Sequence, residues 1–144
     1  MKITHSSAAY IYLYENSAEG FKYNKIFFQH GDSTSENKKK FISLSFSNDH
    51  KIIAGLTNFP DCNAIFYDTS TKGKLFSCTP LNADIWKLTI NPYDGITVCS
   101  SGKDHFKIWK IQEIGLRQIS NILNLNQKQN FSDHAWLNME KIVV

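Results

Sequence analysis

The hydrophobic positions of the chain fall in short runs that are rich in aromatic and β-branched residues, and clusters of Asn, Asp, Ser, Gly and Pro separate these runs. Short runs bounded by turn-forming residues are typical of β-strands. We therefore predict an all-β chain, with a turn at 101–104 among the connections. The predicted strands are 7–14, 21–29, 41–47, 51–57, 64–68, 74–78, 85–90, 96–100, 105–111, 116–122, 134–137 and 141–144.

The strand pattern repeats once along the chain. Phe46 and Ile90 occupy corresponding places in two similar segments, FISLSFSND and IWKLTINPYD, and lie 44 positions apart. Tyr67 and Trp109 correspond in the same way at 42 positions. A period of about 40 to 45 residues filled with short strands is typical of the blades of a β-propeller. The continuous apolar run 52–56 fits an inner blade strand, which neighbouring blades cover on both faces.

The repeat divides the chain into four predicted units. They are a partial blade with a polar loop at 1–40, a complete four-stranded blade at 41–80, a second complete blade at 81–123, and the truncated start of a further blade at 124–144. A propeller needs at least four blades to close a ring. We therefore expect a partial β-propeller whose ring is completed by missing blades or by other chains.

The ends of the third strands carry a weakened form of a known signature. Tyr67-Asp68 and Trp109-Lys110 stand where WD-repeat proteins have a Trp-Asp dipeptide, and Asp61 lies six residues before Tyr67, as the turn aspartate of those repeats does. The chain thus resembles the WD-repeat family. It departs from the pattern because the Gly-His pair is absent and Asp104 lies five residues before Trp109, which leaves the family's buried hydrogen-bond tetrad unassigned. The positions expected to build the blades are Phe46, Asp61, Tyr67, Asp68, Trp86, Asp104, Trp109 and Trp136.

A narrower resemblance rests on several stretches of the last two thirds of the chain. These are FISLSFS at 41–47, FK at 106–107, GLRQ at 115–118, QNF at 129–131, HAWL at 134–137 and KIVV at 141–144. They are similar to the WD-repeat region of cilia- and flagella-associated proteins of the axoneme. The resemblance implies a non-catalytic scaffold in the axoneme of motile cilia. Its implied partners are other axonemal proteins, including components of the inner dynein arms and the doublet microtubules.

Composition and charge indicate which classes of partner and which cell compartment to expect. A formal charge of +3 on 144 residues is too small to predict a nucleic-acid partner. The first residues lack the pattern of a signal peptide and no run is long enough to span a membrane, so we expect a soluble, intracellular protein with no membrane partner. Three widely spaced cysteines suit a reducing compartment.

The residues that carry chemistry are scattered. No histidine is spaced with Cys, Asp or Glu as metal ligands are, and no glycine-rich phosphate loop occurs, so we expect no metal, no cofactor and no small-molecule substrate. Cys99 and His105 could be drawn as a nucleophile and its base, but Cys99 lies in an apolar strand, which favours a structural thiol.

Two other functions are compatible with the same fold. The first is a general cytoplasmic WD-repeat adaptor in a multiprotein complex. The second is a propeller enzyme, which would need polar residues from several blades to converge on a central channel. The sequence supplies no such set, so we predict that the protein is not an enzyme.

Overall fold

The computed structural model describes residues 9–30, 40–78, 84–120 and 129–144, and every regular element among them is a β-strand. The outer hairpins are β1 (Ala9–Ser17) with β2 (Gly20–His30) and β11 (Ala135–Trp136) with β12 (Ile142–Val143). One four-stranded sheet contains β3 (Phe41–Phe46), β4 (Ile52–Thr57), β5 (Ala64–Asp68) and β6 (Lys74–Cys78). The other contains β7 (Ile85–Ile90), β8 (Thr97–Gly102), β9 (His105–Gln112) and β10 (Gly115–Ser120). The prediction of an all-β chain is confirmed.

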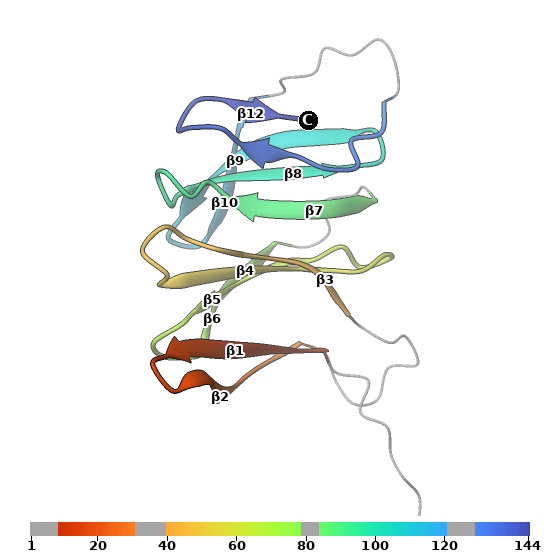
Figure 1. Cartoon of the computed structure of the whole chain (residues 1–144). Coiled ribbons are helices and arrows are strands. Elements are labelled where there is room, and N and C mark those ends of the chain that lie inside the picture. Colours follow the sequence, from red (N-terminus) through yellow and green to blue (C-terminus); the bar gives the residue numbers. More distant parts are fainter. Residues whose placement is uncertain (1–8, 31–39, 79–83, 121–128) are drawn as a thin grey trace, which may run out of the picture.

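The four sheets form an open stack. Each four-stranded sheet is an antiparallel meander in which strands that follow one another in the chain lie side by side. Figure 1 shows β1, β3, β7 and the β11–β12 hairpin one above another along one side of the stack, with the other strands of each four-stranded sheet extending behind. This is a partial β-propeller with two four-stranded sheets and two hairpins, as predicted. The division of the chain at residues 40, 80 and 123 stays a prediction.

The strand bounds follow the hydrophobic pattern closely, with two larger differences. β1 continues to Ser17, past its predicted end at residue 14, and β8 continues past its predicted end at residue 100. The segment 101–104 was expected to be a turn, but β8 continues through Gly102, which pairs with His105 of β9. The turn itself contains only Lys103 and Asp104, and Asp104 adopts a positive φ of 50°. The pair Ser101-Gly102 favours a turn by its residue types. In the structure, however, Gly102 lies in β8, and its missing Cβ lets β8 pass close to the backbone of Asp84 and Ile85 at the start of β7. The predicted strand ends at Ser7 and Ile122 lie outside the described residues.

The core lies between the two four-stranded sheets. β4 and β8 are buried along nearly their whole lengths, as expected of inner strands. Side chains of β4 alternate between two layers. Ala54 and Leu56 join the main core against the β7–β10 sheet, and Ile53 packs with Ile11 of β1 in a smaller cluster. The other buried members of the main core are Ala64, Phe66, Ile85, Leu88, Ile90, Val98 and Trp109.

A seam of serine hydroxyls joins the inner strands β3 and β7. Ser43 Oγ donates to the carbonyl oxygen of Leu88 at 3.0 Å and accepts from the amide of the same residue at 3.2 Å. Ser45 Oγ accepts from the amide of Ile90 at 2.9 Å. Because β7 is the edge strand of its sheet, these hydroxyls satisfy backbone groups that have no strand partner on that side.

The structure contains, in its described part, no helix that is long and apolar enough to cross a membrane.

Gly102 and Gly115 offer a matched test of how tightly the second sheet is packed. A Cβ at Gly102 would lie 2.1 Å from the carbonyl oxygen of Asp84 and 2.7 Å from Cα of Ile85, whereas one at Gly115 would have nothing within 4 Å. We expect Gly102→Ala to lower the free energy of unfolding by about 1–3 kcal/mol, because backbone atoms would have to move apart. Gly115→Ala should leave it within about 1 kcal/mol of the original value. Chemical denaturation of the two variants measures this, and equal stabilities would contradict the close approach at Gly102.

Candidate interaction surface

Trp109 of β9 is anchored by a buried hydrogen-bond triad within the second four-stranded sheet. Its indole Nε1 donates to Ser100 Oγ at 2.8 Å, and the same hydroxyl lies 2.7 Å from His105 Nε2. All three residues are buried. Ser100 stands on β8 and His105 begins β9, so the triad ties two neighbouring strands together in the core.

The two predicted turn aspartates do not belong to this triad. Asp104 is exposed in the β8–β9 turn, and the histidine that follows it meets the serine instead. Asp61 lies in the turn between β4 and β5 and is only half-buried. The described residues around Trp109 therefore form a triad of an indole, a hydroxyl and an imidazole, without a turn aspartate. This triad takes the place of the tetrad that the resemblance left unassigned.

Tyr67 and Asp68 end β5 in different environments. Tyr67 is buried, lies edge-on to the ring of Phe41 with 6.5 Å between centroids, and has its pKa raised to about 12 by burial. The Asp68 carboxylate accepts from the amides of Ser70 and Thr71, each at 2.8 Å. Hydrogen bonds from these residues, chiefly from the Ser70 hydroxyl, hold the pKa of Asp68 below its usual value. Asp68 thus shapes the turn to β6.

Phe46 requires a correction. It was expected to pack inside a blade, but its side chain is 41% exposed at the end of β3 and lies edge-on to the ring of His50. The physical reason is its place at the tip of an inner strand, where the β1–β2 hairpin covers the sheet less completely than the β7–β10 sheet does on the other face. Trp86 is half-buried in β7, at the irregularity between Ile85 and Lys87.

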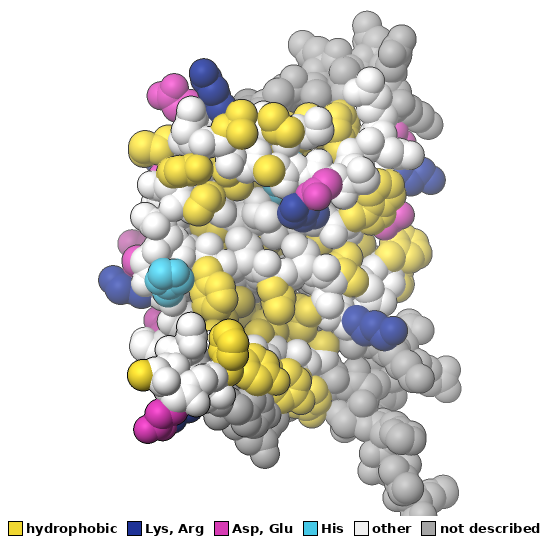
Figure 2. Space-filling model, viewed as in Figure 1, with side chains coloured by type: hydrophobic (Ala, Val, Ile, Leu, Met, Phe, Trp, Pro, Cys, Tyr) yellow, Lys and Arg dark blue, Asp and Glu magenta, His cyan; other side chains and the backbone are white. Residues whose placement is uncertain are grey.

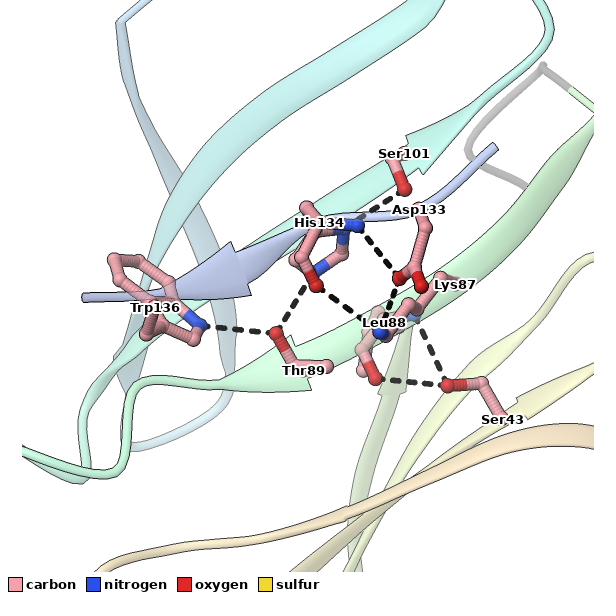
Figure 3. Close-up of polar contacts among 8 residues, drawn as sticks. All are labelled: Ser43, Lys87, Leu88, Thr89, Ser101, Asp133, His134 and Trp136. Atoms are coloured by element: carbon pink, nitrogen blue, oxygen red, sulfur yellow. Dashed lines mark hydrogen bonds and ion pairs between the residues drawn. The ribbon is translucent and has the colours of Figure 1, made fainter. Parts of the chain in front are cut away.

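Trp136 takes part in a second network, which centres on His134 and crosses between sheets (Figure 3). Trp136 Nε1 donates to Thr89 Oγ1 of β7 at 2.9 Å, and that hydroxyl lies 2.7 Å from His134 Nε2. His134 Nδ1 lies 2.8 Å from Ser101 Oγ of β8. Lys87 of β7 donates to the carbonyl oxygen of His134 at 3.0 Å and pairs with Asp133.

The predictions from the sequence did not include the polar side chains that bond to the two tryptophans and to each other in these networks. They are Thr89, Ser100, Ser101, His105 and His134. Their residue types are common at strand ends and gave no separate signal. One pattern could have found them. A histidine precedes each of these two tryptophans by a few residues, at His105 before Trp109 and at His134 before Trp136.

The nucleophile–base pair that the sequence allowed does not form. His105 faces Ser100, so the pairing of Cys99 with His105 that the sequence allowed is not the contact formed. Burial raises the pKa of Cys99 to about 12, which disfavours the reactive thiolate. Among the described residues there is no group of three or more His, Cys, Asp or Glu side chains that could hold a metal ion.

The turns that close the first hairpin of each sheet lie along one rim of the stack, at the left in Figure 1. Neighbouring turns touch. Gly95 of the β7–β8 turn lies beside Asn48 of the β3–β4 turn, and Asn91 Nδ2 donates to the carbonyl oxygen of Met139 in the β11–β12 turn at 3.1 Å. We call this feature the turn rim. Its exposed apolar side chains include Phe21, Phe46, Tyr93, Ile96, Leu137 and Met139.

The turn rim carries exposed apolar side chains together with charged residues of both signs. Figure 2 shows hydrophobic side chains at the upper left of the molecule and in a band that runs from beside an exposed histidine side chain down across the lower front, with charged side chains at the left margin between them. Two of the turns each contain an ion pair. Lys22 pairs with Glu19 in the β1–β2 turn, and Lys51 pairs with Asp49 in the β3–β4 turn. Exposed apolar side chains that recur on adjacent turns are typical of a protein-binding surface.

Comparison with known proteins shows a similarity to a ciliary protein of the mouse. The chain is 27% identical over 108 residues to cilia- and flagella-associated protein 57 of Mus musculus. The matched part is 74% of this chain and only 8% of that protein. The match confirms the expected resemblance to this group of proteins. No protein-family model matches the chain.

Trp109 and Phe46 should differ in their effect on stability. Trp109→Ala removes a buried ring and leaves the Ser100 hydroxyl without its indole donor, so we expect a loss of about 3–5 kcal/mol. Phe46→Ala should cost only about 1 kcal/mol, because much of that side chain is already in water. Urea denaturation of both variants checks this. Similar losses would mean that Phe46 is part of the core after all.

The buried histidines predict a pH-dependent stability. Burial, and to a smaller extent Lys107, lowers the pKa of His105 from 6.5 to about 4. The unfolded chain therefore binds more protons than the folded chain between those values, and the free energy of unfolding should fall as the pH falls from 6.5 to about 4. Thermal melts of the wild type and His105→Gln test this, since the variant should show a shallower slope. An equal slope would exclude His105 as a contributor.

Proposed function

We propose that the chain is a non-catalytic docking module of the axoneme of motile cilia. The observation that carries the proposal is the match to a protein named as cilia- and flagella-associated, which extends over three quarters of the chain. The partial propeller agrees with this role, because blades of this kind serve as rigid supports for loops that bind other proteins.

The turn rim is the docking surface that the geometry supports best. It combines exposed aromatic and apolar side chains with turns that are fixed to one another, and its paired charges leave little net charge to attract a charged partner. An apolar segment of an axonemal protein fits these properties. The partners proposed for it are components of the inner dynein arms or of the doublet microtubules.

The open stack also bears on partners. The described sheets form an open stack and not a ring, and propellers gain their stability by closure. We therefore include in the proposal that blades outside these 144 residues, from the same protein or from another chain, complete the ring.

Fractionation of ciliated cells tests the proposal. The protein should remain with cilia whose membranes have been removed by detergent, and it should be depleted from cell bodies when both are measured by peptide mass spectrometry. Release with the detergent-soluble fraction would contradict an axonemal role. It would favour the alternative of a general cytoplasmic WD-repeat adaptor.

Two double variants test the turn rim as the docking surface separately from the axonemal location of the protein. Tyr93→Ser with Met139→Ser removes two apolar side chains of the turn rim, and we expect at least a fivefold loss from the detergent-resistant axoneme. Leu75→Ser with Ile119→Ser changes side chains of similar exposure on the outer strands β6 and β10 and is the matched control. Equal retention of the two variants would show that the turn rim is not the docking surface, while leaving the axonemal location intact.

A further inference from the structure

Three neighbouring turns of the turn rim are built alike. They are the β3–β4 turn at 47–51, the β7–β8 turn at 91–96 and the β11–β12 turn at 137–141. The first amide of each turn donates to a carbonyl oxygen across the hairpin, from Ser47 to Ile52, from Asn91 to Thr97 and from Leu137 to Lys141. An exposed apolar side chain lies in or directly beside each turn, and these side chains are Phe46, Tyr93 and Met139. The apolar side chains therefore recur once in each sheet.

The middle turn is fixed to both of its neighbours. Asn91 is fully buried, and its Oδ1 accepts from the amide of Tyr93 at 2.9 Å while its Nδ2 donates to the carbonyl oxygen of Met139 at 3.1 Å. On the other side, a Cβ at Gly95 would lie only 3.4 Å from the backbone nitrogen of Asn48. The three turns thus form one surface, and a single segment of a partner can contact all of them.

The spacing of the turns favours one shape for such a segment. Sheets packed face to face lie about 10 Å apart, so an apolar side chain recurs about every 10 Å along the turn rim. Side chains on one face of an extended strand recur about every 7 Å, and neither this distance nor twice its value matches. Helix residues that are seven apart lie on nearly the same face and about 10.5 Å from each other. A helix therefore fits the turn rim better than a strand does.

The charge of the middle turn adds a second requirement. The β7–β8 turn contains Asp94 and no basic residue, whereas each of the other two turns contains one acidic and one basic residue. Burial raises the pKa of Asp94, but hydrogen bonds from Thr97 and from the amide of Ile96 outweigh it and hold this pKa below its usual value. Asp94 is therefore ionised at neutral pH. A basic side chain of the partner near the middle turn would complement its charge.

We propose that an amphipathic helix of an axonemal protein lies across the turn rim, with apolar residues seven apart against Phe46, Tyr93 and Met139. A basic residue of this helix, within one helical turn of the central apolar residue, meets Asp94. The inference rests on the proposed function, and it names the chemistry of the partner. The apolar stripe of the helix covers the exposed side chains, and its polar face stays in water.

Photo-crosslinking in isolated axonemes tests this inference. The photoreactive residue p-benzoylphenylalanine replaces Phe46, Tyr93 or Met139, one position at a time. All three side chains are exposed, so the replacements leave the core intact. Mass spectrometry then identifies the residues of the partner that have reacted. We expect all three positions to reach one segment of one protein, at residues about seven apart, with Lys or Arg within one helical turn of the residue that reacts with position 93.

The possible outcomes separate the helix from the docking surface. Reacted residues two or four apart would indicate an extended strand, and reaction with different proteins would indicate separate partners. Either result would overturn the helix and leave the turn rim as the docking surface. Reaction with no axonemal protein would contradict the proposed function itself. Leu75 of the outer strand β6 has a similar exposure and is the matched control position. The same replacement at Leu75 should not reach this segment, and equal reaction from it would also contradict the inference.

Discussion

The approach of β3 to β7 is the contact on which the arrangement of the sheets depends. Each of these strands is the inner edge of its sheet, and an edge strand presents backbone groups that must find partners. Ser43 and Ser45 supply those partners for Leu88 and Ile90 with side chains small enough to let the two strands come close. The close approach in turn allows the apolar faces behind the seam to meet in one core. A larger residue at either serine would separate the sheets along their inner edge.

The same chemical set, an indole, a hydroxyl and an imidazole, serves two different ends in this protein. Around Trp109 the set lies within one sheet and against the main core, so it adds specificity to a region that apolar packing already holds. Around Trp136 it lies between sheets and outside both hydrophobic clusters, so the hydrogen bonds themselves carry much of the attachment. What surrounds the set, and not its chemistry, decides whether it stabilises the core of one sheet or joins one sheet to the next.

The sequence predicts the strands of this fold well and its contacts less well, for one physical reason. Hydrophobic runs report that a residue lies in a strand, and Tyr67 and Trp109 are buried as their runs suggest. The runs do not report which strand will cover a given face, so Phe46 looks like a core residue although little packs over it. Likewise the pairing of Ser101 with His134 joins positions 33 residues apart. Such pairs depend on how sheets stack, which local pattern does not encode.

The turn rim suits binding because its shape is fixed before any partner arrives. An Asp or Asn side chain closes each of three neighbouring turns. Asp49 accepts from Ser47 and Lys51, Asp94 from Ile96 and Thr97, and Asn138 from Glu140 and Lys141. Side chains carried on turns held in this way lose little conformational freedom on binding, so a modest apolar area can give useful affinity.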